Sequence, residues 1–397
     1  MSRPFEGVKV IDLTHVLAGP FCAYQLAVLG AETIKIEAPG EPDQAREGGS
    51  DRALNERRMG TLYLAQGANK RSITLDLKQP EGQEVLKRLV AVADVVIENY
   101  RSGALAALGL GYEDLKAVNP TLIYCSMTGY GQDGPKGGHT AYDQVIQAAS
   151  GLMSVSGTPE LTPLMVGAPV VDYASGTMAA FAVASALYQR GQTGTGQYID
   201  FSMLDTALIM MASSVTAFLH DGTVPKPSGN QKSYAGNSCY ETADGLLMLG
   251  AFNRRQHERL WRALDRPDLA KLSSWDAMAA NREVLAAELA PILATRPAAE
   301  WEVFLNEHSV PAARVRSLDE ALDQDQLNHR DALLHTFDDA PGVAGPVTVP
   351  VAAFRYAHGG PRADSPPPEM GADTDAVLGE AGYGAAEVRA LRGAGVI

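Results

Sequence analysis

The sequence predicts an α/β protein with a mostly parallel sheet, joined to a small α+β domain. Short apolar stretches alternate with helical stretches over the first 130 residues, which is the pattern of βαβ units. The pattern changes after a polar, glycine-containing segment at 221–236. The chain has 397 residues, of which 46% are hydrophobic and 20% charged, so two packed cores are possible.

The first half of the chain predicts five strands and three helices. The strands are expected at 8–13, 32–37, 72–77, 94–98 and 122–127, and the helices at 20–29, 80–92 and 104–118. Pro80 lies in the first turn of its helix, where a missing N–H is harmless. Ligands bind beyond the carboxyl ends of the strands in such sheets. The loops at 14–20, 99–103 and 128–140 are therefore the expected binding loops.

The second half predicts the small domain and a return to the first. A hairpin is expected from Cys239 to Gly250, with Asp244-Gly245 as its turn, followed by amphipathic helices over 254–307. After these come a β-like segment at 343–354, a proline-rich extended segment at 361–372 and a helical end at 376–397. The predicted boundaries are 1–224 for the large domain, 225–320 for the small domain, and 321–397 for a segment returning to the large domain.

The composition argues against several classes of partner. The formal net charge of −14 disfavours nucleic acid and anionic membranes. The most apolar helical stretch, Met178 to Tyr188, is too short to cross a bilayer, so no membrane span is expected. Three widely separated cysteines show no disulfide or metal spacing, which favours reduced thiols in a cytoplasmic protein. The histidines show no metal-binding motif either, so no metal is expected.

Three common catalytic motifs are absent. The chain contains no G-x-G-x-x-G after its first expected strand, no G-x-x-x-x-G-K-[ST], and no G-x-S-x-G. These absences disfavour a dinucleotide site, an ordinary P-loop and a serine hydrolase.

Asp172 is the most informative single residue. An extended stretch at 166–171 is expected to lead to it, and a helix of small residues to follow. Local statistics favour a helix N-cap, because aspartate is a preferred capping residue. The alternative is a nucleophile: small neighbours leave room for a ligand, and the helix dipole would keep the carboxylate ionised. A carboxylate attacks a thioester without a base, because it has no proton to lose.

Several cations lie near the expected strands. Lys70 and Arg71 precede the strand at 72–77, Lys78 follows it, and Arg101 lies in a binding loop. Such residues are usually solvated surface charges, but several together at one sheet would neutralise phosphate. Asn99 follows the strand at 94–98 and could place an amide in the crevice.

Seven ordered segments together resemble one family. They are VIDLTHVLAGPFCAYQLAVLGAETIKIEAPG at 10–40, NKRSITLDLKQPEG at 69–82, DVVIENYRSGAL at 94–105, MTGYGQDGP at 127–135, YDQVIQAASGLMSVSG at 142–157, GAPVVDYASGTMAAFAVASALYQRGQTGTGQ at 167–197 and VPAARVRSLDEAL at 310–322. The chain resembles the class III CoA-transferases, the CaiB/BaiF family, which includes formyl-CoA transferase and carnitine CoA-transferase.

This resemblance implies a fold, a dimer and a reaction. The large domain would be Rossmann-like and built from both termini, and two chains would interlock as a homodimer. Asp172 stands at the position of the family's catalytic aspartate. It would attack an acyl-CoA to form a mixed anhydride, then an aspartyl-CoA thioester, from which CoA passes to an acceptor acid. The substrates would be acyl-CoA, the source of coenzyme A, and a small carboxylic acid, and no tightly bound cofactor is implied.

The resemblance also implies CoA contacts, with departures from the family pattern. The positions that match family contacts are His15, Val16, Ala18, Leu75, Lys78, Asn99, Tyr100 and Tyr142. Ala38 and Ala107 stand where formyl-CoA transferase has arginines, so Lys70, Arg71 or Arg101 are expected to hold the phosphates instead.

The same family contains 2-methylacyl-CoA racemases, which are the alternative function. Their His-Asp pair lies about thirty residues before the aspartate, and this chain has Tyr142-Asp143 there. Racemisation by two bases needs a proton acceptor on each face of the α-carbon, and tyrosine accepts protons poorly at neutral pH. A transferase is therefore preferred to a racemase, and a non-catalytic CoA-binding protein is a third possibility.

Overall fold

The computed structural model describes residues 2–397 and divides them into two compact units. The large unit takes the chain as far as Leu152, then Val166–Asp221 and His329–Ile397, and the small unit takes Met153–Met165 and Gly222–Asn328. The predicted boundaries at 224 and 320 therefore miss the segment 153–165. That segment belongs to the small unit, where the Gly229 N–H donates to the Gly157 carbonyl at 2.7 Å.

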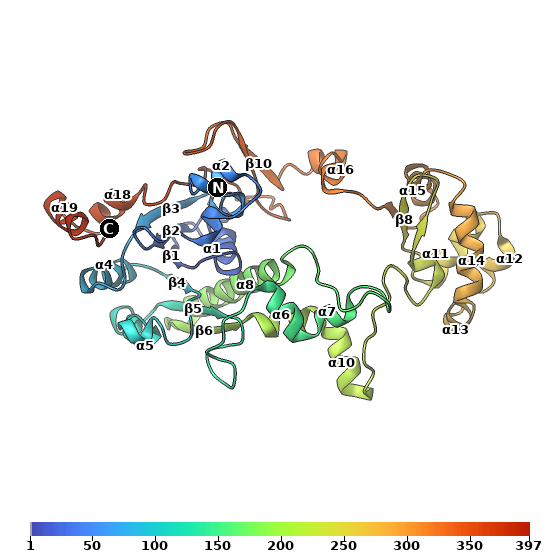
Figure 1. Cartoon of the computed structure of the whole chain (residues 1–397), viewed down its shortest axis with the longest axis horizontal. Coiled ribbons are helices and arrows are strands. Elements are labelled where there is room, and N and C mark those ends of the chain that lie inside the picture. Colours follow the sequence, from blue (N-terminus) through green and yellow to red (C-terminus); the bar gives the residue numbers. More distant parts are fainter. Residues whose placement is uncertain (1) are drawn as a thin grey trace. The chain divides into compact units, whose positions relative to one another are not determined.

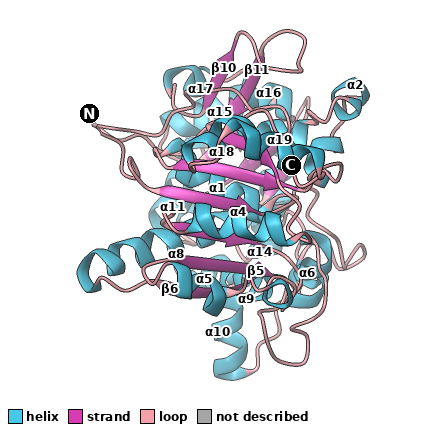
Figure 2. Cartoon of the chain, turned by 90° about the vertical axis from the view of Figure 1, so that its left-hand side faces the viewer, coloured by secondary structure: helices cyan, strands magenta, loops and turns pink. Residues whose placement is uncertain are grey.

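The large unit is built on a six-stranded sheet in which all neighbouring strands are parallel (Figures 1 and 2). The strand order is β3-β2-β1-β4-β5-β6. The strands are β1 Lys9–Leu13, β2 Glu32–Glu37, β3 Lys70–Thr74, β4 Val95–Glu98, β5 Ile123–Thr128 and β6 Gln197–Ser202. This confirms the predicted α/β class. β3 begins two residues before its predicted start, because Lys70 and Arg71 already pair with Thr33 and Ile34 of β2.

Helices cover both faces of this sheet. On one face lie α4 Pro80–Val90, α5 Tyr112–Val118, α18 Thr374–Glu380 and α19 Ala385–Gly393; on the other lie α1 Ala18–Val28 and α8 Val170–Thr193. Side chains alternate between the faces along a strand. Val10 accordingly packs under α1 and α8, whereas Ile11 and Leu13 pack on the α4 side. The helix predicted at 104–118 is interrupted, because Gly109 adopts a left-handed conformation with φ 69°.

α8 is the longest helix of the large unit and packs along α1. Gly176 permits their close approach: a Cβ there would lie 2.6 Å from the Ala18 carbonyl oxygen. The expectation that the apolar stretch from Met178 to Tyr188 is too short to cross a bilayer is wrong on length, because the stretch belongs to the 24 residues of α8, which by length and composition could cross a membrane. Core helices of soluble proteins meet the same criteria, and α8 buries Ala179, Val183 and Ala186 in the core.

The remaining elements of the large unit surround the sheet. They are η1 Gln44–Glu47, α2 Arg52–Glu56, α3 Thr61–Gly67, η2 Ala106–Leu108, α6 Asp143–Ser150, α9 Met203–Met210, α10 Ala212–Asp221 and the hairpin of β10 Leu334–Phe337 and β11 Val347–Pro350; α7 Leu152–Val155 begins at its boundary. The hairpin packs with α1 and α3 in a third apolar cluster. The β-like segment predicted at 343–354 is β11.

The small unit has its own core around a three-stranded antiparallel sheet. Its strands are β7 Cys239–Glu241, β8 Leu246–Leu249 and β9 Ala312–Arg314; its helices are η3 Ala235–Asn237, α11 Arg254–Ala263, α12 Pro267–Ala270, α13 Trp275–Ala280, α14 Arg282–Leu293, α15 Ala298–Glu307, α16 Leu318–Leu322 and α17 Asp325–His329. The predicted hairpin turn is present, with the Thr242 N–H donating to the Gly245 carbonyl at 2.8 Å. The unit extends past residue 320, because Arg314 of β9 pairs with Glu320 of α16 at 2.8 Å.

Candidate active site

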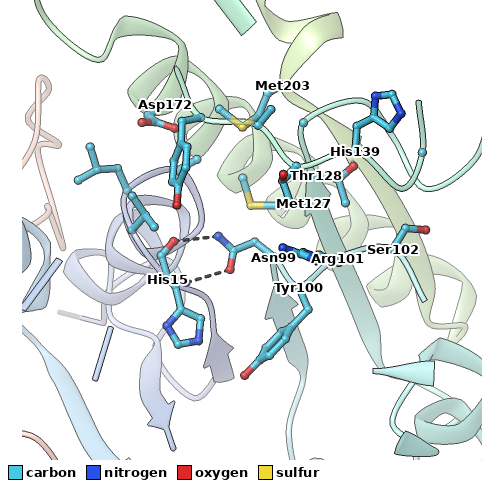
Figure 3. Close-up of a pocket in the computed structure, with 18 residues that line it drawn as sticks. His15, Asn99, Tyr100, Arg101, Ser102, Met127, Thr128, His139, Asp172 and Met203 are labelled. Carbon is cyan, nitrogen blue, oxygen red and sulfur yellow. Dashed lines mark hydrogen bonds between the residues drawn. The ribbon is translucent and has the colours of Figure 1, made fainter. Parts of the chain in front are cut away.

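A cavity of about 310 Å³ opens at the carboxyl ends of β1, β4 and β5 (Figure 3). β1 and β4 are neighbours at the point where the strand order reverses, which is where ligands bind in open parallel sheets. The walls come from the loops after these strands, from α8 and from α9. The lining residues are His15–Ala18, Asn99–Ser102, Met127–Gly129, Gly137, His139–Tyr142, Asp172 and Met203.

Asp172 is the third residue of α8 and is not the cap of that helix. α8 begins at Val170, so the extended stretch expected at 166–171 ends earlier than predicted. The cap is supplied by Asp143 of α6, whose Oδ2 accepts the N–H groups of Val171 at 2.7 Å and Asp172 at 3.0 Å. The Asp172 side chain is thereby left to face the cavity, with 8% of the residue exposed.

The surroundings of Asp172 make its carboxyl weakly acidic. Burial, and then the nearby Asp143 carboxylate, raise the pKa of Asp172 to about 7. Desolvation and a like charge therefore oppose the ionisation that the helix dipole was expected to favour. A carboxylate of higher pKa is a stronger nucleophile, and a substantial fraction is still ionised near neutral pH.

Asn99 ties two walls of the cavity together. The His15 N–H donates to Asn99 Oδ1 at 2.9 Å, and Asn99 Nδ2 donates to the His15 carbonyl at 2.8 Å, as the dashed lines in Figure 3 show. The His15 and Tyr100 rings pack edge to face, with 5.7 Å between the ring centroids. Burial lowers the pKa of His15, so its imidazole is neutral at pH 7.

The structure brings most of the predicted site residues together. Those that line the cavity with Asp172 are His15, Val16, Ala18, Asn99, Tyr100, Arg101 and Tyr142. The remaining four, Lys70, Arg71, Leu75 and Lys78, do not line it.

Two of the proposed phosphate ligands are engaged elsewhere. Lys70 is buried, and its Nζ pairs with Asp12 at 2.9 Å and donates to the Pro20 carbonyl at 2.9 Å. Arg71 lies near the amino end of β3 and pairs with Glu380 at 2.6 Å. Of the three expected cations, only Arg101 reaches the cavity.

Leu75 and Lys78 lie at the same sheet edge but outside the cavity. Leu75 is a core side chain with 1% of the residue exposed. Lys78 projects into solvent and pairs with Glu41 at 3.6 Å.

Sequence reasoning missed residues that only the fold brings to the cavity. The sequence places Asp143 only at the position of a racemase motif, and its capping of α8 joins residues 28 apart, so no local pattern signals it. Met127 and Met203 line the cavity because β5 ends and α9 begins there. Thr128 and His139, which also line it, belong to the predicted binding loop at 128–140.

Comparison with known proteins places this site in a family. The model of CoA-transferase family III matches residues 5–374. The chain belongs to CoA-transferase family III. It is 35% identical to human succinyl-CoA:glutarate CoA-transferase over 382 residues, covering 95% of this chain and 86% of that protein. It is 34% identical to succinate–glutarate CoA-transferase from Agrobacterium fabrum over 394 residues, covering 95% of both.

Solved structures agree with this assignment. A CaiB/BaiF family protein from Brucella suis superposes with a TM-score of 0.82 at 31% identity, covering 96% of this chain and 100% of that one. This family III CoA-transferase therefore moves CoA between an acyl-CoA and a carboxylate.

Among residues 2–397, no group of three or more histidine, cysteine, aspartate or glutamate side chains is arranged to hold a metal ion.

Proposed function

We propose that this enzyme transfers CoA from an acyl-CoA donor to a small carboxylic acid through covalent intermediates on Asp172. One observation carries the proposal: Asp143 caps α8 and leaves the Asp172 carboxyl, with 8% of the residue exposed, facing the cavity at the sheet's switch point. The family assignment and the position of Asp172 in the family resemblance support it further.

The first half of the reaction loads the enzyme. An Asp172 oxygen attacks the thioester carbonyl carbon, the C–S bond breaks, and CoA leaves as a thiolate. The product is an acyl–aspartyl anhydride. The thiolate then attacks the Asp172 carbonyl carbon, the anhydride C–O bond breaks, and the donor acid leaves as its carboxylate. Asp172 is then a thioester of CoA.

The second half reverses these steps with the acceptor. The acceptor carboxylate attacks the Asp172 carbonyl carbon and expels the thiolate, which forms a second anhydride. The thiolate attacks the acceptor's acyl carbon, and Asp172 leaves as a carboxylate. No step gains or loses a proton, so no general base is required.

We further propose that the substrates are dicarboxylates and their CoA thioesters. The human and Agrobacterium relatives are named for exchange between succinate and glutarate. Arg101 lines the cavity and could bind one anionic group there, either a second carboxylate or a CoA phosphate.

An exchange assay tests the proposed function. Succinyl-CoA and acetyl-CoA are each offered with isotopically labelled C4 to C6 dicarboxylates, and the CoA products are identified by mass spectrometry. The proposal predicts labelled acyl-CoA without ATP. Deuterium entering the α-carbon of 2-methylacyl-CoA in D₂O, with no exchange of acids, would instead identify a racemase.

A homodimer and a cytoplasmic location belong to the same proposal. Helices α8, α9 and α10 expose large apolar side chains: Phe181 and Tyr188 of α8 are 68% and 74% exposed, and Leu219 of α10 is 77% exposed. Such a surface is typical of an interface. The three cysteines are free and buried, which fits a reducing compartment. If the enzyme is a homodimer, sedimentation will give twice the chain mass of 42.1 kDa.

Activity is expected to rise with pH through the titration of Asp172. Only the ionised carboxylate attacks, and the pKa of Asp172 is raised to about 7 by burial and Asp143. In a profile of kcat/KM for acyl-CoA, the rate should increase about tenfold per pH unit below that pKa and level off above it. A profile that is flat between pH 5 and 8 would contradict this assignment.

A further inference from the structure

Val16, in the cavity wall, has a backbone conformation that its side chain disfavours. Its φ is 73°, in the left-handed region. A β-branched residue is an outlier there, because its two γ carbons crowd the backbone. Strained residues of this kind persist only where their surroundings hold them, and they concentrate at functional sites.

Two buried side chains form hydrogen bonds with the two polar groups of the Val16 backbone. The Val16 N–H donates to Asp43 Oδ1 at 2.8 Å. Its carbonyl accepts a hydrogen bond from Gln66 Nε2 at 2.7 Å. Asp43 is fully buried and Gln66 is 2% exposed, so water does not compete for these bonds.

The two residues before Val16 are also fixed by hydrogen bonds from side chains of other segments. Lys35 Nζ pairs with Asp43 Oδ2 at 2.8 Å and also donates to the Thr14 carbonyl at 2.8 Å. Asn99 binds both the N–H and the carbonyl of His15. Polar side chains from four other segments therefore fix the turn from Thr14 to Val16.

This turn determines where α1 begins relative to Asp172. Leu17 precedes the first residue of α1, Ala18, and both line the cavity. The Ala18 carbonyl lies against Gly176, where a Cβ would approach it to 2.6 Å. Gly176 is one helical turn after Asp172 in α8. A change of conformation at Val16 would thus shift the wall that faces the nucleophile.

We propose that Gln66 and Asp43 are positioning residues that hold Val16 in its left-handed conformation and thereby align the first turn of α1 with Asp172. This role rests on the proposed function, because it concerns the rate of acyl transfer. Misplacement of a reacting group by about 1 Å can cost about 100-fold in rate.

A double-mutant cycle between Gln66→Leu and Val16→Gly tests this role. Leucine keeps the volume of glutamine and removes the bond to the Val16 carbonyl. Glycine adopts positive φ without steric cost, so its conformation depends less on the hydrogen bonds from Gln66 and Asp43. Gln83→Leu is the matched control, because Gln83 Nε2 also donates to a backbone carbonyl, that of Leu77 at 3.2 Å, outside the cavity.

The expected result is strong coupling in kcat. Gln66→Leu lowers kcat about tenfold in the Val16 enzyme, with a much smaller change in KM, and less than threefold in the Val16→Gly enzyme. Val16→Gly alone lowers kcat severalfold, because it loosens the loop, and Gln83→Leu leaves kcat within twofold. An equal effect of Gln66→Leu in both backgrounds, or an effect no larger than that of Gln83→Leu, would overturn the role.

Two further measurements separate this role from the proposed function. CoA affinity by calorimetry and the midpoint of thermal unfolding are measured for all four proteins of the cycle. Coupling between Gln66→Leu and Val16→Gly in CoA affinity or in the unfolding midpoint tests whether Gln66 stabilises the conformation of Val16, even if no acid exchange is found. Exchange activity with no coupling in any quantity would keep the proposed function and reject the positioning role.

Discussion

Asp172→Asn is expected to abolish CoA transfer, lowering kcat by about 10³-fold or more. The amide is isosteric with the carboxyl but does not attack a thioester. The fold should survive, because Asp143 caps α8 through the backbone N–H groups of Val171 and Asp172, which the substitution leaves in place. Acid exchange followed by mass spectrometry measures the loss, and calorimetric binding of CoA shows that the site is still formed.

The same variant is expected to be more stable than the wild type at neutral pH. The pKa of Asp172 is raised to about 7 by burial and Asp143, so folding disfavours its ionised form. Between the unfolded pKa near 4 and the folded value, the unfolded state binds fewer protons, and stability falls as pH rises. Asparagine does not ionise, so Asp172→Asn avoids this loss of stability. The variant should unfold at a higher temperature than the wild type at pH 8, and the two unfolding temperatures should differ less at pH 4.

Asp205→Asn is the matched control for Asp172→Asn. Asp205 lies in the first turn of α9, as Asp172 lies in that of α8, but it is exposed and does not line the cavity. It should retain activity within about twofold of the wild type. Full activity in Asp172→Asn, or an equal loss in Asp205→Asn, would contradict the role given to Asp172.

Lys35→Met is expected to cause the largest loss of stability, about 3–5 kcal/mol. Lys35 is 1% exposed and pairs with Asp43 at 2.8 Å. Its charge also acts on Asp12 and Glu37, so three buried carboxylates lose a cation when it is removed. The midpoint of chemical unfolding measures the effect. A change in the free energy of unfolding below about 1 kcal/mol would contradict the view that Lys35 stabilises the buried carboxylates of Asp12, Glu37 and Asp43.

An exposed ion pair provides the control for Lys35→Met. Lys87 pairs with Glu84 at 2.9 Å on the surface of α4, and Lys87→Met should cost less than about 1 kcal/mol. The buried network also predicts acid sensitivity. Burial opposes ionisation of Asp12, Glu37 and Asp43, but Lys35 and other partners outweigh it and lower each pKa. The stability they contribute is present above the unfolded values near 4 and is lost as pH falls through the folded ones.

The sequence predicted the sheet better than it predicted the charges. Apolar strand patterns are local, so β1, β2, β4 and β5 were found to within a residue or two. The pairing of a charge is not local. Lys70 was expected at phosphate, but its partner Asp12 lies 58 residues earlier in the sequence, on a strand that the fold places nearby.

The candidate site was predictable where a local or a family pattern existed and not elsewhere. The ends of the expected strands predicted the loops at His15 and Asn99, and family resemblance implied a catalytic role for Asp172; the structure places all three around one cavity. Neither pattern identified Asp143 as the cap of α8, nor Gln66 and Asp43 as partners of Val16. Those contacts join segments 27 to 50 residues apart, and only the packed chain brings them together.

Trapping of the covalent intermediate tests the central claim most directly. The enzyme is incubated with an active acyl-CoA donor and hydroxylamine, digested, and mapped by mass spectrometry. An anhydride or thioester on Asp172 predicts a hydroxamate at that residue, dependent on the donor and absent from Asp172→Asn. A hydroxamate at another carboxylate, or none during active turnover, would contradict covalent catalysis by Asp172.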